Sequence, residues 1–200
     1  MTEHEPVTGD HVVTVDDAGH RTGTFARSAV HTTETPLHLA FSCYLLDDAD
    51  RVLMTRRALV KRTWPGVWTN SFCGHPRWTE TTAESIDRHA SHELGVAVRD
   101  VQVALPDFRY RAVDASGVVE NEVCPVYVAR VVGDVAANPD EVAEHHWVDA
   151  RDLAAATAAT PWAFSPWMIW QLDALRAAVA DAPLTAPAPG ARTLARVLGL

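Results

Sequence analysis

Residues 74–96 constrain the fold of this chain more than any other segment, because they predict a helix with both ends marked. Thr81 and Glu84 have the spacing of a capping box, in which each side chain binds the backbone of the other residue at the helix start. Gly95 favours the left-handed conformation that ends many helices. The apolar residues between these ends recur at helical spacing and are Ile86, Ala90 and Leu94.

Short apolar runs separated by polar turns predict strands on both sides of this helix. The predicted strands span residues 12–15, 22–27, 37–46, 52–56, 96–104, 108–113, 118–132 and 145–148. Polar turns at 47–50 and 114–117 favour antiparallel neighbours. Ser165 and Pro166 are typical of a helix start, and we expect that helix to continue to about Ala180. The pattern predicts an α/β fold with a long antiparallel or mixed sheet.

The composition favours a single domain. The chain has 200 residues, of which 48% are apolar, and this suffices for one compact core. We expect the domain to cover residues 1–181. Residues 182–200 are rich in Pro and Ala, which predicts a loose linker with a short amphipathic end and no catalytic role.

The charge pattern argues against nucleic acid and membranes as partners. The net charge is −9 and no run of Lys or Arg interrupts it. No apolar stretch is long enough to span a bilayer, and the first residues lack a signal-peptide pattern, so we expect a cytoplasmic protein. The odd, scattered Cys43, Cys73 and Cys124 predict neither a disulfide framework nor a zinc ribbon. We expect Cys43 and Cys124 to be buried and unreactive.

Two short motifs carry reactive side chains. In the segment 69–76, Cys73 precedes His75 by two residues. Glu120 and Glu122 flank Asn121, and on a strand both carboxylates would point to the same face. Two converging carboxylates repel each other unless a cation or a shared proton lies between them. A metal is the simplest resolution, so these motifs predict a reactive site.

The predicted helix and the loop before it resemble the Nudix box, in which glutamates bind the magnesium of a diphosphate substrate. Residues 74–96 match the spacing of that box. His89 and His92 stand where the Nudix pattern has glutamates, which leaves Glu93 as the retained carboxylate. We expect Glu93 to bind one Mg²⁺ and the two histidines to lie on a solvated helix face with local ion pairs.

With this helix and three further matching segments, the chain resembles type I isopentenyl-diphosphate isomerases. The segments are residues 69–76, 117–125 and 161–167, and the resemblance spans roughly residues 22–171. It implies a Nudix-like mixed β-sheet sandwiched by helices, with the core of the domain at about 22–171. It also implies interconversion of isopentenyl and dimethylallyl diphosphates, in which one proton is added and another removed as the double bond moves, in isoprenoid precursor biosynthesis.

The same resemblance implies the catalytic roles. Cys73 and Glu122 would lie on opposite faces of the five-carbon unit and manage the two proton transfers. Trp167 would stabilise the carbocation with its ring face, and Tyr110 would hydrogen-bond near the catalytic glutamate. The alternatives are an ordinary core position for Trp167 and a half-buried sheet position for Tyr110.

The resemblance further implies two cations. One tightly held divalent metal would be surrounded by His31, His38, His75, Glu120 and Glu122. Imidazole ligands suit Zn, Mn or Fe better than calcium. Mg²⁺ would bind together with the substrate diphosphate, through Glu93 and the backbone carbonyl of Cys73.

Basic residues that match the family's diphosphate contacts complete the predicted site. Arg57 and Lys61 would contact the phosphates, with a solubilising surface loop as the alternative. Arg27 occupies a position that often holds Lys, and His89 one that commonly holds Arg. The pair 145–146 has no ligand spacing, and we expect a surface strand end there.

Two other functions compete with a prenyl diphosphate isomerase. The first is Nudix-type hydrolysis of a nucleoside diphosphate derivative, against which the missing glutamates argue. The second is a non-catalytic protein that binds prenyl or other diphosphates, against which the intact Cys73 and Glu122 argue. The sequence is silent on the oligomeric state.

Overall fold

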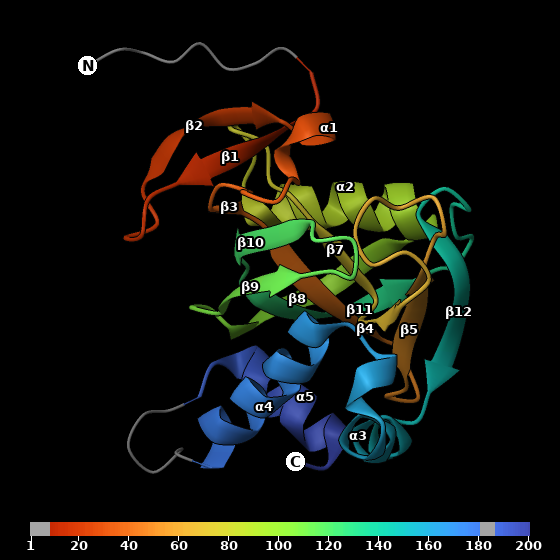
Figure 1. Cartoon of the computed structure of the whole chain (residues 1–200). Coiled ribbons are helices and arrows are strands. Elements are labelled where there is room, and N and C mark those ends of the chain that lie inside the picture. Colours follow the sequence, from red (N-terminus) through yellow and green to blue (C-terminus); the bar gives the residue numbers. More distant parts are fainter. Residues whose placement is uncertain (1–8, 181–186) are drawn as a thin grey trace.

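The computed structural model describes residues 9–180 and 187–200, which form two β-sheets and flanking helices (Figure 1). The smaller sheet has the order β2-β1-β3-β10-β9, with β1 at His11–Val15, β2 at Arg21–Ala26, β3 at His38–Leu39, β9 at Arg109–Val113 and β10 at Val119–Val123. The larger sheet has the order β12-β5-β4-β11-β8, with β4 at Phe41–Leu46, β5 at Val52–Arg57, β8 at Ala97–Leu105, β11 at Val126–Val132 and β12 at Val142–Val148. The short strands β6 (Trp68–Thr69) and β7 (Phe72–Gly74) pair with β5 and β4.

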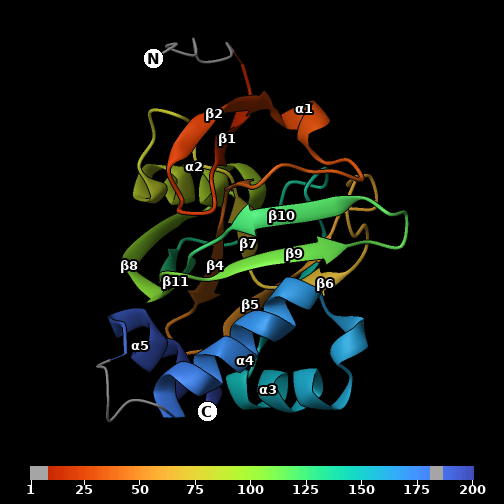
Figure 2. The same cartoon turned by 60° about the vertical axis from the view of Figure 1, so that its left-hand side comes forward.

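Helices cover both faces of the larger sheet (Figures 1 and 2). On one face lies α2 (Thr82–Leu94), and on the other lie α3 (Ala150–Ala159), α4 (Pro166–Ala180) and α5 (Pro189–Leu198). The short α1 (Arg27–Val30) follows the β1–β2 hairpin, and the 3₁₀ turn η1 (Pro161–Ala163) precedes α4. The sheet is mixed, because β11 runs parallel to β4 and antiparallel to β8. The predicted α/β sandwich is therefore confirmed.

Helix α2 begins and ends where the sequence predicts. The Thr81 side chain accepts from the backbone N–H of Glu84, whose own side chain accepts from the backbone of Thr81. Gly95 ends the helix with φ 67°, a left-handed conformation that glycine adopts without a Cβ clash. The predicted start of α4 is confirmed as well, and the helix continues to Ala180 as expected, whereas α3 has no counterpart among the predicted elements.

The prediction of one strand over residues 118–132 is wrong, as is that of one strand over residues 37–46. Each segment divides between the two sheets, one at Ala40 and the other between β10 and β11 at Pro125. The segments run in parallel and change sheets together, with Ala40 N–H donating to Val123 O at 2.9 Å and Ser42 N–H to Pro125 O at 3.0 Å. Pro125 has no N–H to continue a ladder, which permits the break.

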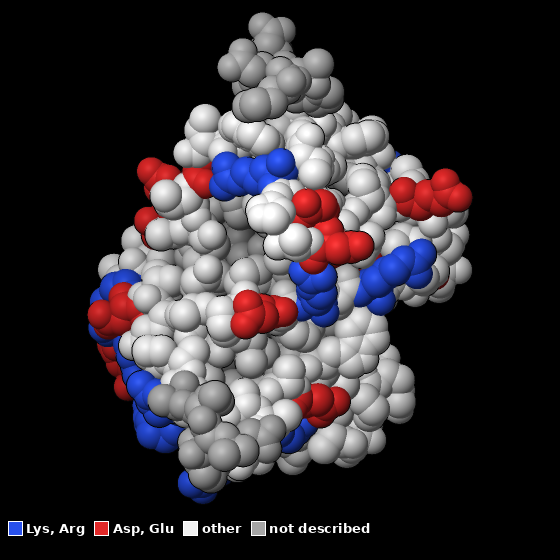
Figure 3. Space-filling view, turned by 90° about the vertical axis from the view of Figure 1, so that its left-hand side faces the viewer, with Lys and Arg blue, Asp and Glu red and all other residues white. Residues whose placement is uncertain are grey.

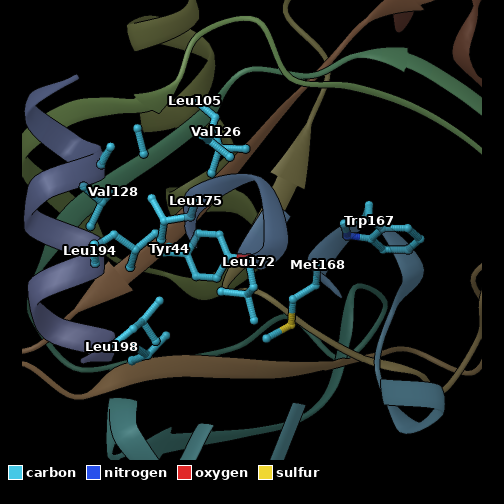
Figure 4. Close-up of a cluster of buried hydrophobic side chains, with 14 of the residues drawn as sticks. Tyr44, Leu105, Val126, Val128, Trp167, Met168, Leu172, Leu175, Leu194 and Leu198 are labelled. Atoms are coloured by element: carbon cyan, nitrogen blue, oxygen red, sulfur yellow. The ribbon is translucent and has the colours of Figure 1, made fainter. Parts of the chain in front are cut away.

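The prediction of a loose C-terminal linker is wrong for α5. Leu194 and Leu198 are buried against α4 and β8, in the same cluster as Tyr44 and Leu172 (Figure 4). The close approach depends on Gly190, at which a Cβ would lie 2.6 Å from the Val103 carbonyl oxygen. The expected amphipathic character is present, since α5 buries one face against the sheet. Residues 182–186 of the predicted linker lie outside the described residues.

The surface carries charges of both signs. On the face in Figure 3, Lys and Arg side chains are interspersed with Asp and Glu. None of the helices in the described parts of the chain is long and apolar enough to cross a membrane.

Candidate active site

Three histidines and one glutamate converge where the smaller sheet meets the segment after β7. His31 caps the C-terminus of α1, His38 lies on β3, His75 follows β7, and Glu122 pairs with His38 across parallel strands. One potential ligand atom from each of the four lies within 4.8 Å of every other. These residues come from four separate segments, so the cluster exists only in the folded chain.

The donor set fits a divalent cation. In the neutral tautomer in which His38 Nδ1 donates to Pro36 O at 2.8 Å, Nε2 keeps a lone pair and lies 3.3 Å from His75 Nε2. Glu122 Oε1 lies 3.2 Å from His75 Nε2. Among the described residues, the buried ring nitrogens His31 Nε2 and His75 Nδ1 have no hydrogen-bond partner. Unpaired buried nitrogens beside a carboxylate are costly unless a ligand satisfies them.

The electrostatics of the cluster favour neutral His31 and His75 and an ionised Glu122, whereas the Glu122 charge favours the protonated form of His38. Burial lowers the pKa of His31 to about 3 and that of His75 to about 4. Burial acts in the same direction on His38, but its hydrogen bond to Glu122 and the charge of Glu122 raise the pKa. Burial also opposes ionisation of Glu122, yet hydrogen bonds from His38 and His75 hold its pKa well below the ordinary range. Neutral imidazole and carboxylate are the forms that bind metals.

Glu120 lies on the same face of β10 as Glu122, as the period of two predicts, but other groups hold its carboxylate. Tyr110 donates to Oε2 at 2.7 Å and Thr63 to Oε1 at 2.6 Å, while Arg57 Nη2 lies 3.9 Å from Oε1. Burial and the neighbouring Glu122 charge raise the pKa of Glu120. Glu120 is thus outside the group of four convergent ligand atoms and stands beside it.

Cys73 lies on β7 opposite Ser42 of β4. Its Sγ is 3.2 Å from Ser42 Oγ and 3.4 Å from Asn70 Nδ2. Burial raises the pKa of the thiol to about 12, although hydrogen bonds with Ser42 and Asn70 act in the opposite direction. Cys43 and Cys124 are fully buried in the core, as predicted.

Aromatic rings form one wall of the site around Trp167. Trp167 is 1% exposed, and its Nε1–H donates to Asn70 Oδ1 at 3.2 Å. The Trp64 ring meets it edge to face at 5.3 Å, the Tyr110 ring lies 5.8 Å away, and the Arg57 guanidinium carbon lies 5.5 Å from its ring centre. Trp167 is therefore buried like a core residue and also lines the site, as both interpretations of the sequence predict.

A cavity of about 320 Å³ joins these groups. The residues that line it are Asp10, Arg27, Ser28, His31, Arg57, Lys61, Arg62, Thr63, Cys73, Gly74, His75, Tyr110, Glu120, Glu122 and Trp167. Arg27 pairs with Asp10 at 3.2 Å, and Lys61 pairs with Glu141. Burial lowers the pKa of Lys61 to about 8. The basic residues predicted to contact phosphates thus lie on the same cavity as Cys73.

The prediction of a solvated helix face is wrong for His89 and right for His92. His89 is 1% exposed and lies beneath Gly74, whereas the His92 side chain is 58% exposed and lies 3.7 Å from a carboxylate oxygen of Glu141. His89 Nδ1 bonds Glu93 Oε1 at 2.7 Å. Burial opposes ionisation of Glu93, but this bond lowers its pKa overall. Glu93 is buried and is not among the residues that line the cavity.

Known proteins share this architecture and much of this sequence. A model of the NUDIX domain matches residues 36–168. The isopentenyl-diphosphate Delta-isomerase of Leifsonia xyli subsp. xyli is 56% identical over 176 residues, which cover 87% of this chain and 95% of the relative. That of Klebsiella pneumoniae subsp. pneumoniae is 52% identical over 165 residues, covering 82% and 90%. This chain belongs to the isopentenyl-diphosphate Delta-isomerase family.

Solved structures share the fold of this chain. The DR0079 protein of Deinococcus radiodurans superposes with a TM-score of 0.58 at 18% identity, covering 75% of this chain and 90% of that one. The MutT protein of Methanosarcina mazei Go1 gives 0.53 at 18% identity, covering 69% and 91%. At these identities the likeness shows the shared fold alone.

Sequence reasoning missed several polar residues around the cavity of this isomerase-family member. Thr63 holds Glu120, and Ser42 and Asn70 contact the Cys73 sulfur. Asn70 lies inside the motif 69–76, three residues before Cys73, so its position in that motif was an available signal. Ser42 lies in a hydrophobic strand distant in sequence, and no local pattern identifies it. His145 and His146 lie on β12, away from the cavity lining, where His146 packs on Trp68.

Proposed function

We propose that this chain interconverts isopentenyl diphosphate and dimethylallyl diphosphate. Membership of the isomerase family supports the reaction class, and one observation of the site carries the assignment of residues. Cys73, Glu122 and Trp167 line a single cavity that also presents Arg27, Arg57 and Lys61. The two groups able to exchange protons and the aromatic ring match an alkene that passes through a carbocation. The basic rim matches the diphosphate attached to that alkene.

In the proposed reaction, Cys73 and Glu122 act as the acid and base pair. One adds a proton to the terminal carbon of the alkene, which leaves a tertiary carbocation, and the other removes a proton from the carbon on the opposite side of the cation. The Trp167 ring stabilises the positive charge through its quadrupole while the apolar wall keeps water away from it. Tyr110 holds Glu120 beside Glu122 and so helps to orient the pair of carboxylates.

The residues that would hold the tight metal are His31, His38, His75 and Glu122, with Glu120 adjacent. When bound, Zn, Mn or Fe would withdraw electron density from the Glu122 carboxylate and lower its proton affinity. Glu122 remains oriented toward the cavity by its contacts with His38 and His75. We propose that Mg²⁺ enters with the diphosphate, held by Glu93 and the backbone carbonyl of Cys73.

Arg57, Lys61 and Arg27 bind the diphosphate in this proposal. A guanidinium fork matches phosphate oxygens, and the half-buried Lys61 adds a localised charge. We also propose a cytoplasmic location, because the reaction needs a reduced Cys73 thiol and the cytosol keeps thiols reduced.

The test is proton NMR of isopentenyl diphosphate in heavy water with the purified protein, Mg²⁺, and Zn²⁺ or Mn²⁺. The expected product is dimethylallyl diphosphate that carries solvent deuterium. The Cys73→Ala variant should lose the reaction. The matched control is Cys43→Ala, because it removes a fully buried thiol that does not line the cavity.

Two outcomes would contradict the proposal. Phosphate release from nucleoside diphosphate derivatives, with an unchanged isopentenyl diphosphate spectrum, would indicate a Nudix-type hydrolase. Tight binding of the diphosphate without turnover in the folded, metal-loaded protein would indicate a non-catalytic diphosphate-binding protein.

A further inference from the structure

A buried hydrogen-bond chain ends at the sulfur of Cys73. Tyr44 O–H donates to Gln171 Oε1 at 2.9 Å, and Gln171 Nε2 donates to Ser42 Oγ at 2.8 Å. Ser42 Oγ then lies 3.2 Å from Cys73 Sγ. Tyr44 and Ser42 are 0% exposed and Gln171 is 1% exposed, so water cannot replace these contacts. The chain joins β4 and α4 behind the cavity wall.

The donor at each hydrogen bond from Tyr44 to Cys73 follows from which groups carry a proton. Among the described residues, Gln171 Oε1 is the acceptor within reach of the Tyr44 hydroxyl, and a reversed amide would leave that buried O–H proton without one. The amide nitrogen of Gln171 therefore faces Ser42 and donates a hydrogen bond to the Ser42 hydroxyl oxygen. The one hydroxyl proton of Ser42 is left to point at a sulfur atom.

Two sulfur atoms compete for that proton. Cys73 Sγ lies 3.2 Å from Ser42 Oγ, and Cys124 Sγ lies 3.5 Å from it. Asn70 also contacts the nearer sulfur, since its Nδ2 lies 3.4 Å from Cys73 Sγ and its Oδ1 lies 3.5 Å away. Ser42 and Asn70 thus both contact the sulfur of Cys73, a residue that lines the cavity.

We propose that Ser42 is a positioning residue that donates its hydroxyl proton to Cys73 Sγ, in a direction set by Gln171 and Tyr44. This inference rests on the proposed isomerase function. When Cys73 gives up its proton during turnover, the S–H bond breaks and the electron pair stays on sulfur, toward which Ser42 O–H already points. The bond reforms when a proton returns. A donor held in place needs no reorganisation as that charge develops.

The first measurement is the infrared S–H stretch of the resting protein, which needs neither substrate nor turnover. Subtracting the spectrum of Cys73→Ala assigns the Cys73 band, because Cys43 and Cys124 also contribute. We expect Ser42→Ala to shift the Cys73 band and Tyr44→Phe to shift it less in the same direction. Tyr44→Phe removes one hydroxyl group without adding volume, so it serves if Ser42→Ala does not fold.

The matched control is Ser71→Ala. Ser71 is also 0% exposed and makes two buried backbone hydrogen bonds, to Leu53 O and from Leu45 N–H, both at 2.7 Å. It therefore loses comparable structural bonds without a contact to Cys73 Sγ. We expect its Cys73 band to stay in place.

The second measurement is the isomerase rate. We expect Ser42→Ala to lower kcat about tenfold with KM changed less than about twofold, as for a hydrogen bond of ordinary net strength that matters after binding. Ser42→Thr retains the hydroxyl and should recover most of this loss.

An unshifted Cys73 band in Ser42→Ala, or an equal shift in Ser71→Ala, would overturn the proposal. Equal kcat losses in Ser42→Ala and Ser71→Ala would also overturn it, since they would indicate a purely structural role. If Ser42→Ala shifts the Cys73 band but the wild-type protein has no isomerase activity, the Ser42 contact is supported and the proposed function is refuted.

Discussion

Adding one methyl group at Gly74 should disturb both the stability and the site of this protein. A Cβ at this position would lie 2.4 Å from Cδ2 and 2.5 Å from Nε2 of His89. Carbon atoms in contact are normally about 3.5–4.0 Å apart, so the ring must move by about 1 Å. No positive φ marks Gly74, so the expected effect is steric.

The His89 ring has little freedom to make this movement. Its Nδ1 bonds Glu93 at 2.7 Å, its Nε2 lies 3.2 Å from Arg88 Nη1, and its edge meets the Phe41 ring at 5.5 Å. Overpacking a core costs about 1–3 kcal/mol, and breaking a buried hydrogen bond costs about 1–3 kcal/mol. We expect Gly74→Ala to lose about 3 kcal/mol, which corresponds to a Tm lower by about 6–12 °C for a chain of this size.

Urea unfolding followed by circular dichroism measures this loss, and a double-mutant cycle assigns it. Adding Gly74→Ala to a His89→Ala background should cost less than about 0.5 kcal/mol, because the opposing ring is gone. Gly117→Ala is the control, since its Cβ meets nothing within 4 Å and its φ of 87° predicts only a backbone cost of about 1 kcal/mol. Equal losses from Gly74→Ala in the wild-type and His89→Ala backgrounds would refute the steric argument.

Three further predictions concern pH, metal and the C-terminal helix. Burial opposes ionisation of Glu80, but Arg88 binds both of its oxygens at 2.7 Å, and the pKa falls from 4.5 to about 2. The pair therefore stabilises the fold above about pH 4.5 and loses this effect as the pH falls toward 2, so Glu80→Gln should remove about 2 kcal/mol of pH-dependent stability after allowance for screening. Parallel pH profiles for wild type and Glu80→Gln in urea titrations would contradict this. Free Zn²⁺ or Mn²⁺ at about 100 times its Kd should stabilise chelator-treated protein by about 3 kcal/mol, and thermal unfolding of His38→Ala should show a much smaller gain. Leu194→Ala should lower the unfolding free energy by about 2–5 kcal/mol, because this side chain is 2% exposed, whereas a loss below about 0.5 kcal/mol would mean that α5 is not docked as described.

Local sequence rules predict the elements that depend on neighbouring residues. The capping box at Thr81 and the left-handed Gly95 mark α2 because both signals act within one helical turn. The shared face of Glu120 and Glu122 likewise follows from the two-residue period of a strand. The motif 69–76 and the family resemblance predict Cys73 and His75 as site residues from the sequence alone.

Other predictions failed because they depended on residues distant in sequence. His89 follows a pattern typical of an exposed helix face, yet it is buried because Gly74 leaves room for its ring. The Pro/Ala-rich C-terminus resembles a linker, yet α5 docks because Gly190 permits its backbone to approach Val103. The space that each glycine leaves cannot be inferred from the sequence of the segment that packs into it.

The sequence by itself determined the capped helix, the strand periodicity, the set of reactive residue types and the isomerase-family membership, because each is carried by spacing along the chain. Only the tertiary structure brought one potential ligand atom each from His31, His38, His75 and Glu122 within 4.8 Å of one another. It also placed the Glu120 carboxylate in hydrogen bonds with Tyr110 and Thr63. It alone also placed the Ser42 hydroxyl behind the Cys73 sulfur. Burial and convergence are set by contacts between segments far apart in sequence, and such contacts have no local signature.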